Sequence, residues 1–284
     1  MQNHERRSIL CPNCRRLVSV DETQCPYCGM KHPSSLSWTR SLGTMFSDPE
    51  RTVRVIIIVN TAMFILSLLL NPSRIGLSMN PFGMLSPDHR SLVLLGETGA
   101  VPVGQLGRWW TLVTANYLHG GVLHILFNML ALKQIAPLIY HEYGFYRMAS
   151  IYTLGGVTGF YVSVLAGIPF TLGASAAVCS LIGSALYYGK SRGGSYGEAV
   201  YRQLGGWVIG IFAFGLLMPG INNWGHGGGL VGGIVLGFLL GYRERNPETM
   251  SHVVLGWICV LGTVLALAWG VFSGLLVYFF VMVR

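Results

Sequence analysis

The stretch TLGASAAVCSLIGSALYYG, residues 171–189, contains no charged residue and carries small side chains where a soluble helix would carry polar ones. It is apolar enough for lipid, yet it begins with Gly173 and the hydroxyl of Ser175. A serine inside a membrane-spanning helix usually donates a hydrogen bond back to its own helix. The hydroxyl alone therefore decides nothing, and the rest of the chain has to explain it.

The whole chain has the composition of a membrane protein. Of its 284 residues, 52% are hydrophobic and 11% are charged, whereas a soluble domain is about a quarter charged. Charged residues are absent from the blocks 148–189, 203–242 and 249–283. A helix needs about 20 apolar residues to cross the hydrocarbon layer, so each of the first two blocks has room for two crossings. The sequence thus predicts an all-α polytopic membrane protein.

We expect seven membrane spans. They lie at residues 55–70, 120–140, 148–166, 172–189, 205–218 and 224–242, with the last one within 253–283. The segments AGIPFTLG and LMPGINNWGHGGG separate the paired crossings of the two long blocks. The N-terminus is polar and the first apolar run starts near residue 55, so we expect no cleavable signal peptide.

Basic residues in the short loops predict the orientation of the chain. The loops on one side, and the segment before the first span, contain Arg40, Arg51, Arg54, Arg147, Lys190, Arg192, Arg202, Arg243 and Arg245. The opposite loops, GIPFT and PGINN, contain no lysine or arginine. We therefore expect a cytoplasmic N-terminus and an external C-terminus, in a bacterial cytoplasmic membrane. The net charge of +8 mostly reflects this topology and a basic tail, so we expect no nucleic-acid partner.

Four cysteines precede the first span. Cys11, Cys14, Cys25 and Cys28 form a C-x2-C-x10-C-x2-C array, which suits tetrahedral zinc and resembles a zinc ribbon. Disulfides are the alternative, but they are rare in the cytosol, and iron is the main competing metal. Four protein ligands would close the site, so we expect structural Zn²⁺ and no catalytic cofactor. The sequence does not identify a cytosolic partner of this module.

The titratable residues restrict the chemistry of the spans. None of the eleven Asp and Glu residues lies inside a predicted span, which excludes a membrane aspartyl protease with paired carboxylates. The chain has no H-E-x-x-H motif, which argues against an intramembrane zinc protease. Histidines remain. His119, His124 and His226 lie near the outer ends of their spans, whereas His141 and His252 lie on the cytoplasmic side.

His226 lies on a helix with a stripe of small residues. Glycines recur there every four residues, at Gly225, Gly229, Gly233, Gly237 and Gly241, and such faces let helices approach closely in lipid. Ser175, Cys179 and Gly183 form a matching small face in the 172–189 span. Packing these faces would place Ser175 and His226 at one depth, where the imidazole can take the hydroxyl proton. The alternative is that His226 only donates hydrogen bonds inside the bundle.

An acyl transfer also needs hydrogen-bond donors for the oxyanion. His124 and Asn128 are four residues apart and so share one face of their helix near its outer end. Together with the backbone N–H of Ser175 they can converge on one oxygen. The alternative for this pair is polar contact between helices.

Three segments together resemble the signatures of rhomboid intramembrane serine proteases. They are GRWWTLVTANYLHGGVLHILFNMLAL, LGASAAVCSLIG and NNWGHGGGLVGGIVLG, in the order and spacing of that family. The resemblance implies a six-helix core with a cavity open to the outside. It implies that Ser175 is the nucleophile, His226 the base, and His124 and Asn128 the oxyanion residues, with His119 as the first histidine of that motif. Arg108 and Trp109 match an element of the first outer loop, and Gly229 and Gly233 match the glycines after the base.

Two residues depart from the family pattern. Ala176 follows the serine where glycine is usual, and Cys179 stands where Tyr or Phe commonly stacks on the histidine. Neither change removes the Ser–His pair. We read both Cys179 and Cys259 as small packing residues.

The function expected from this resemblance is serine endopeptidase activity on single-span membrane proteins near the outer membrane face, through an acyl-enzyme. Its partners would be transmembrane substrates and the lipid bilayer. The alternative is a catalytically silent rhomboid-like protein that binds membrane clients. A transporter is disfavoured because the spans lack paired ionisable residues and no two halves visibly repeat.

The expected domains follow the chain. A zinc-ribbon-like module occupies residues 1–35 and a linker residues 36–50. The rhomboid six-helix core covers residues 51–245, and an additional C-terminal transmembrane helix covers residues 246–284.

Overall fold

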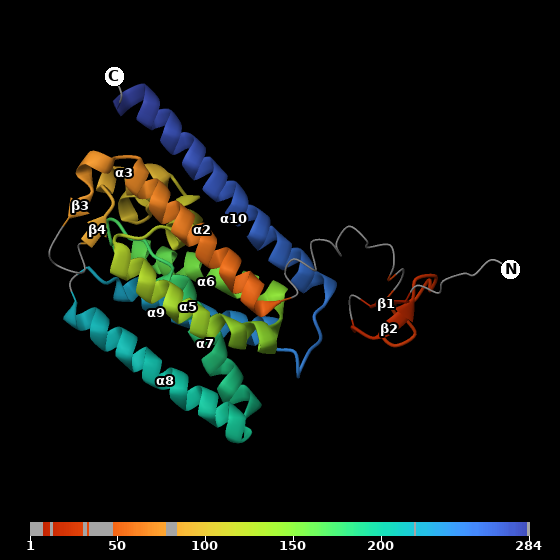
Figure 1. Ribbon diagram of the computed structural model, residues 1–284. Helices are drawn as coiled ribbons and strands as arrows, with labels where there is room; N and C mark the ends of the chain where they lie inside the picture. Colours follow the sequence, from red (N-terminus) through yellow and green to blue (C-terminus); the bar gives the residue numbers. More distant parts are fainter. Residues whose placement is uncertain are drawn as a thin grey trace.

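The structure is a computed structural model that describes residues 8–11, 14–30, 33, 48–77, 84–218 and 220–282. Most of the predicted linker, 36–50, therefore lies outside the described residues. Long helices make up the membrane part of the described chain (Figure 1). They are α2 (Pro49–Leu69), α5 (Val122–Tyr143), α6 (Phe145–Leu165), α7 (Ser175–Arg192), α8 (Gly194–Leu217), α9 (Asn223–Leu240) and α10 (Met250–Val277).

Each of the seven predicted spans corresponds to one of these helices. Five helices, α2, α5, α6, α8 and α10, are long and apolar enough to cross a membrane on their own. Helices α7 and α9 carry more small and polar residues, and they pack against α6 and against each other. The chain is a multi-pass integral membrane protein with an all-α membrane domain.

Helix α8 differs most from the sequence prediction. It begins at Gly194, whereas the predicted span begins at residue 205. The added turns contain Glu198 and Arg202, which form an exposed ion pair one helical turn apart, with Arg202 Nε 2.7 Å from Glu198 Oε1. Charged residues argue against a membrane span but not against a helix, so this helix extends beyond its apolar part.

The segment between α2 and α5 folds into short elements. These are η1 (Pro72–Arg74), β3 (Gly76–Leu77), β4 (Met84–Ser86), α3 (His89–Leu95), η3 (Ala100–Gln105), α4 (Thr111–Thr114) and η4 (Ala115–Tyr117). They gather at one end of the bundle (Figure 1). The turn before α7 pairs with this segment, because Thr98 and Thr171 exchange two backbone hydrogen bonds of 3.1 and 2.7 Å. We call residues 97–121, 167–176 and 220–226 the site end.

Glycines bring the backbones of α7 and α9 into contact. A Cβ built on Gly229 would overlap the carbonyl oxygen of Ala176, and one on Gly233 would overlap that of Ser180. In the reverse direction, a Cβ on Gly183 would overlap the carbonyl oxygen of Leu230. Only residues without a side chain fit such contacts, which confirms the predicted close packing of these two helices.

The face of α7 in this contact differs from the predicted one. The α9 glycines meet Ala176, Ser180 and Ser184 of α7, and Gly183 of α7 meets the Leu230 backbone of α9. The predicted stripe of Ser175, Cys179 and Gly183 is therefore shifted by one residue, and only Gly183 takes part. Both stripes consist of small residues spaced by four, so the sequence could not distinguish them. Gly241 also leaves the predicted stripe, because it ends α9 with a φ of 66°.

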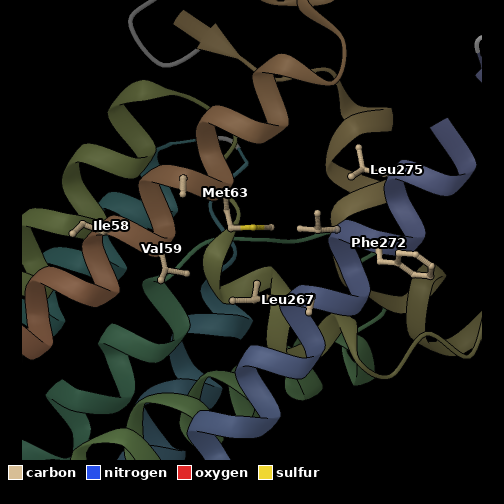
Figure 2. Close-up of a pocket in the computed structure, with 9 residues that line it drawn as sticks. Ile58, Val59, Met63, Leu267, Phe272 and Leu275 are labelled. Atoms are coloured by element: carbon tan, nitrogen blue, oxygen red, sulfur yellow. The ribbon is translucent and has the colours of Figure 1, made fainter. Parts of the chain in front are cut away.

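Helix α10 packs along one side of the core. A Cβ on Gly256 would lie 2.8 Å from the Tyr146 backbone of α6, and one on Gly270 would lie 2.8 Å from the carbonyl oxygen of Leu95, at the end of α3. Between α2 and α10 lies an apolar groove of about 550 Å³. In Figure 2, Met63 of α2 points across this groove toward α10. The seventh helix thus contacts both the core and the segment between α2 and α5.

The N-terminal strands form a small hairpin. Strand β1 (Ser8–Leu10) pairs antiparallel with β2 (Leu17–Ser19), with Ile9 opposite Val18. Ile9 and Val18 are buried with Cys11 and Cys25 in a separate small core. The cysteines therefore lie within a folded module, as the sequence indicated.

Candidate functional site

Ser175 is the first residue of α7. The turn before it forms backbone hydrogen bonds with Thr98 and Ala115. Gly173 has a φ of 122°, a conformation that favours glycine. Its N–H donates to the carbonyl oxygen of Ala115 at 2.8 Å. A Cβ on Gly173 would lie 2.6 Å from His124 Nε2 and 3.7 Å from Ser175 Oγ. The serine hydroxyl and the His124 ring therefore both border Gly173.

Two histidines support this turn. His119 is fully buried, and its Nε2 accepts a 3.5 Å hydrogen bond from the N–H of Ala174. The rings of His119 and His124 meet edge to face, with centroids 5.0 Å apart. His124 Nδ1 accepts a 3.3 Å hydrogen bond from the N–H of Gly120. A neutral imidazole that accepts at Nδ1 carries its proton at Nε2, which here is the nitrogen beside Gly173.

Asn128 follows His124 by one turn and is buried. Its Nδ2 donates to the carbonyl oxygen of His124 at 2.9 Å. One amide hydrogen is thus used inside the helix, and the amide has a second hydrogen for another acceptor. The structure places Asn128 on the same face of α5 as His124, one turn later. Its role as an oxyanion residue stays a prediction.

His226 lies in the first turn of α9 and is buried, with 8% of its surface exposed. Its Nδ1 has no hydrogen-bond partner among the described residues. The described residues also show no hydrogen bond between this ring and Ser175 Oγ. Catalytic hydrogen bonds are often long before substrate binds, so this geometry is compatible with a Ser–His pair.

The residues that adjoin Ser175 and His226 in the sequence meet at one glycine of α6. A Cβ on Gly159 of α6 would lie 2.5 Å from the carbonyl oxygen of Gly225 and 2.9 Å from the Cβ of Ala176. Ala176 directly follows Ser175, and Gly225 directly precedes His226. Ser175 and His226 are therefore each the sequence neighbour of a residue that packs against Gly159.

The two departures from the family pattern are buried. Ala176 is 1% exposed, and its methyl group fills the space beside Gly159. Cys179 lies one turn after Ser175 and is 3% exposed. Cys259 is buried in α10, which agrees with the packing role that the sequence suggested for both cysteines.

Arg108 and Trp109 have different surroundings. Arg108 Nη1 donates to the carbonyl oxygen of Val93 at 3.0 Å, and the guanidinium lies 4.7 Å from the centroid of the Trp110 ring. Arg108 thus satisfies a carbonyl in the last turn of α3. Trp109 is 58% exposed. Arg108 connects parts of the segment between α2 and α5.

Sequence reasoning missed a buried carboxyl group at the site end. Glu97 is 5% exposed, and its Oε2 lies 3.5 Å from Nε2 of the more exposed His89. Burial raises the pKa of Glu97 from its ordinary value of 4.5 to about 7. The only sequence signal was its position between the apolar helix α3 and Thr98.

Sequence reasoning also missed a set of hydrogen-bonded polar side chains near the starts of α7 and α9. Asn222, Thr171 and Ser163 share hydrogen bonds between three elements. Asparagine before a helix is a usual N-cap, but nothing in the sequence joined it to the other two.

The four N-terminal cysteines come together. Their Sγ atoms all lie within 4.8 Å of one another, and the pairs Cys11–Cys28 and Cys14–Cys25 have Sγ–Sγ distances of 3.6 Å. None of the four forms a disulfide. Four sulfurs about 2.3 Å from one tetrahedral zinc are separated by about 3.8 Å. The cluster therefore fits a tetrahedral metal ion.

Comparison with known proteins relates this chain to one family. Residues 106–243 match the family model of the rhomboid domain. RHOMBOID-like protein 4 of Arabidopsis thaliana is 30% identical over 205 residues, which cover 66% of this chain and 52% of that protein. Rhomboid protease GluP of Bacillus subtilis is 32% identical over 173 residues, 60% of this chain and 34% of that protein. Rhomboid-like protease 5 of Toxoplasma gondii is 29% identical over 188 residues, 63% of this chain and 22% of that protein. The chain thus spans about half or less of the length of these three relatives.

Proposed function

The chain belongs to the rhomboid family, and from this premise we propose that it is an intramembrane serine endopeptidase that cleaves single-span membrane proteins. One observation carries the proposal. The residues adjoining Ser175 and His226 meet at Gly159, and the Ser175 hydroxyl borders the same glycine as His124 Nε2. These contacts support a site in which Ser175 is the nucleophile, His226 the base and His124 a hydrogen-bond donor.

The proposed reaction proceeds through an acyl-enzyme. Ser175 Oγ attacks the scissile carbonyl carbon, and His226 accepts the hydroxyl proton. The C–N bond then breaks, and His226 returns the proton to the leaving amine. Water adds to the ester with His226 again as base, and breaking of the ester bond releases the acid and restores Ser175.

The oxyanion of both tetrahedral intermediates needs donors. His124 supplies its Nε2–H, which the hydrogen bond at Nδ1 leaves beside Gly173. The backbone N–H of Ser175 and the second amide hydrogen of Asn128 are the other proposed donors. Gly173 is essential to this arrangement, because a side chain there would overlap the His124 ring.

The proposed topology places the N-terminus in the cytoplasm and the site end at the outer face of a bacterial cytoplasmic membrane. The basic loop residues support it. We further propose that the four N-terminal cysteines hold one structural Zn²⁺, because four thiolates close a tetrahedral site. Metal analysis of purified protein under reducing conditions is expected to give about one zinc per chain. Iron or no metal would contradict this assignment.

Cleavage of a model substrate tests the function. Purified wild-type protein in liposomes is expected to cleave a single-span peptide with a fluorophore and a quencher on opposite sides of the cleavage site. Ser175→Ala and His226→Ala are expected to be inactive, and the double variant no worse than either, because the pair acts as a unit. The matched control is Ser184→Ala, since Ser184 Oγ bonds within its own helix to Leu181. Cleavage by Ser175→Ala would contradict the proposal.

A silent client-binding protein is the second candidate, and Cys179 is the observation that favours it. An aromatic ring stacked on an imidazole contributes about 0.5–1.5 kcal/mol, so its loss should slow the enzyme by roughly three- to tenfold. Cys179→Phe should then raise cleavage modestly, provided that the variant keeps the wild-type unfolding temperature. If wild type is inactive while Ala176→Gly or Cys179→Phe cleaves the substrate, the chain is a silenced rhomboid.

A further inference from the structure

Three hydrogen-bonded side chains connect α6 to the segments that enter α7 and α9, the helices of the proposed Ser–His pair. Asn222 Nδ2 donates to Ser163 Oγ at 2.7 Å and to Thr171 Oγ1 at 2.9 Å. Asn222 Oδ1 accepts from the N–H of Gly225 at 3.1 Å. Ser163 is fully buried in α6, and Thr171 is 7% exposed in the turn before α7. The amide of Asn222 thus joins three elements while it caps α9.

The positions of these residues relate directly to the pair. Thr171 is four residues before Ser175, and Asn222 is four residues before His226. The backbone N–H of His226 donates to the carbonyl oxygen of Asn222 at 3.2 Å. The side-chain bond between Thr171 and Asn222 therefore connects the segment that enters the serine helix to the segment that enters the histidine helix.

Thr171 is itself fixed from the other side. Its backbone pairs with Thr98 through hydrogen bonds of 3.1 and 2.7 Å, and the Thr98 hydroxyl accepts from Thr111 Oγ1 at 3.0 Å. Ser163 Oγ donates to the carbonyl oxygen of Gly159 at 3.0 Å. Gly159 is the glycine against which Ala176 and Gly225 pack. Asn222 therefore bonds to two anchored residues rather than to mobile ones.

We propose that Asn222 is a positioning residue, whose amide bonds to Thr171 and Ser163 fix the separation of Ser175 from His226. The proposal rests on the proposed protease function. It goes beyond that function because Asn222 touches neither the substrate nor the reacting atoms. Small displacements matter at such a pair, since a misplacement of about 1 Å can cost about 10²-fold in rate.

The test separates the cross-link from the helix cap. Serine is about as good an N-cap as asparagine, but it is too short to reach both hydroxyls, so Asn222→Ser keeps the cap and loses the cross-link. Its kcat on the liposome substrate is expected to fall about 10- to 100-fold, with KM and the thermal unfolding midpoint close to wild type. A role in folding alone would lower the unfolding midpoint and leave the kcat of the folded fraction unchanged.

The Thr171 variants keep the test decisive if Asn222→Ser fails to fold. Thr171→Val removes the accepting hydroxyl and is expected to lower kcat similarly, whereas Thr171→Ser keeps the hydroxyl and is expected to restore it. The double variant Asn222→Ser/Thr171→Val should lose no more than Asn222→Ser alone, because Asn222→Ser already removes the bond to Thr171. Thr61→Val is the matched control, since Thr61 Oγ1 bonds within α2, to Ile57 at 2.9 Å.

The outcomes distinguish this inference from the proposed function. A wild-type protein without cleavage contradicts the protease function itself. If wild type cleaves and the folded Asn222→Ser or Thr171→Val protein keeps kcat within about twofold, the positioning role is wrong and the function stands. A loss in Thr171→Val that Thr171→Ser does not restore also contradicts it, because the hydroxyl would then not be the cause.

Discussion

The two ends of the helix bundle use different polar groups. At the site end, buried histidines, hydroxyls and amides bond to backbone atoms, and Glu97 is buried near His89. The opposite end, which we call the loop end (residues 140–148, 189–197 and 241–252), uses exposed charges such as the Arg192–Glu244 pair at 2.8 Å. There the buried Arg147 donates to the carbonyl oxygens of Asn246 and Pro247.

We infer from this difference that the loop end anchors connecting segments, whereas the site end carries the groups proposed for catalysis. At the loop end charged side chains form an ion pair or bond to hydroxyls and backbone carbonyls, which holds connecting segments in place. Buried atoms of Arg147 and Glu248 there have no hydrogen-bond partner among the described residues. At the site end His226 keeps a buried nitrogen without a partner among the described residues, and polar groups inside a membrane protein usually mark function. The following experiments compare the two ends.

The largest contrast is expected between two histidines of the same helix. His124→Ala removes a proposed oxyanion donor at the site end and should lower kcat about 10²- to 10³-fold. His141→Ala, near the loop end of α5, should leave kcat within about twofold. Asn128→Ala should lower kcat by about 10²-fold or less, because other donors remain. If His124→Ala cleaves like wild type, the ring only supports the turn at Gly173.

The glycine contacts between α7 and α9, which run from the site end toward the loop end, should not tolerate an added methyl group. Gly233→Ala would overlap the carbonyl oxygen of Ser180, and such overpacking costs about 1–3 kcal/mol, here near the upper bound because backbone has to move. Gly210 of α8 has open space around it, so Gly210→Ala should be neutral or stabilise the helix by up to about 1 kcal/mol. Thermal unfolding in detergent measures both variants. Equal midpoints would contradict the packing described for α7 and α9.

Glu97 should make the site end sensitive to pH. Its folded-state pKa of about 7 exceeds its ordinary value of 4.5, so folding favours the protonated form. Stability should be greatest below pH of about 4.5 and fall as pH rises through about 7. At about 1.4 kcal/mol for each pKa unit, Glu97→Gln should stabilise the protein by up to about 3 kcal/mol at pH 8. At pH 4.5 it should have little effect. Unfolding midpoints at the two pH values test this, with the exposed Glu198→Gln as control. An equal effect of Glu97→Gln at both pH values would contradict it.

The smallest effect is expected at the N-terminal module. Deletion of residues 1–35 should remove the bound metal and leave the kcat of detergent-solubilised protein within about twofold. The reason is that every residue proposed for catalysis lies in α5, α7 or α9. Cys25→Ser is the milder variant, with the same expectation. A large loss of activity in both would mean that the module supports the site.

Much of this architecture could be predicted from the sequence. The charge-free blocks located five of the helices, apolar runs located α2 and α5, and the cysteine spacing located the cysteine cluster. The glycine spacing also predicted that α7 and α9 pack closely. These features depend on composition and on local periodicity, which a single sequence shows directly.

The remainder depends on tertiary contacts. Two stripes of small residues run along α7, at Ser175/Cys179/Gly183 and at Ala176/Ser180/Ser184, and only the position of α9 decides between them. Likewise, the bond between Thr171 and Asn222 joins residues 51 positions apart. The burial of Glu97 results from folding of the short elements between α2 and α5, whose sequence has no strong period.

Covalent labelling of the nucleophile tests the central claim most directly. A fluorophosphonate reacts with an activated serine hydroxyl, with loss of fluoride as the base takes the proton. We predict that wild-type protein carries one label per chain, on the peptide that contains Ser175. His226→Ala and Ser175→Ala should carry none, whereas Ser184→Ala should be labelled like wild type. Absence of label on folded wild-type protein, or equal labelling of Ser175→Ala, would contradict the account.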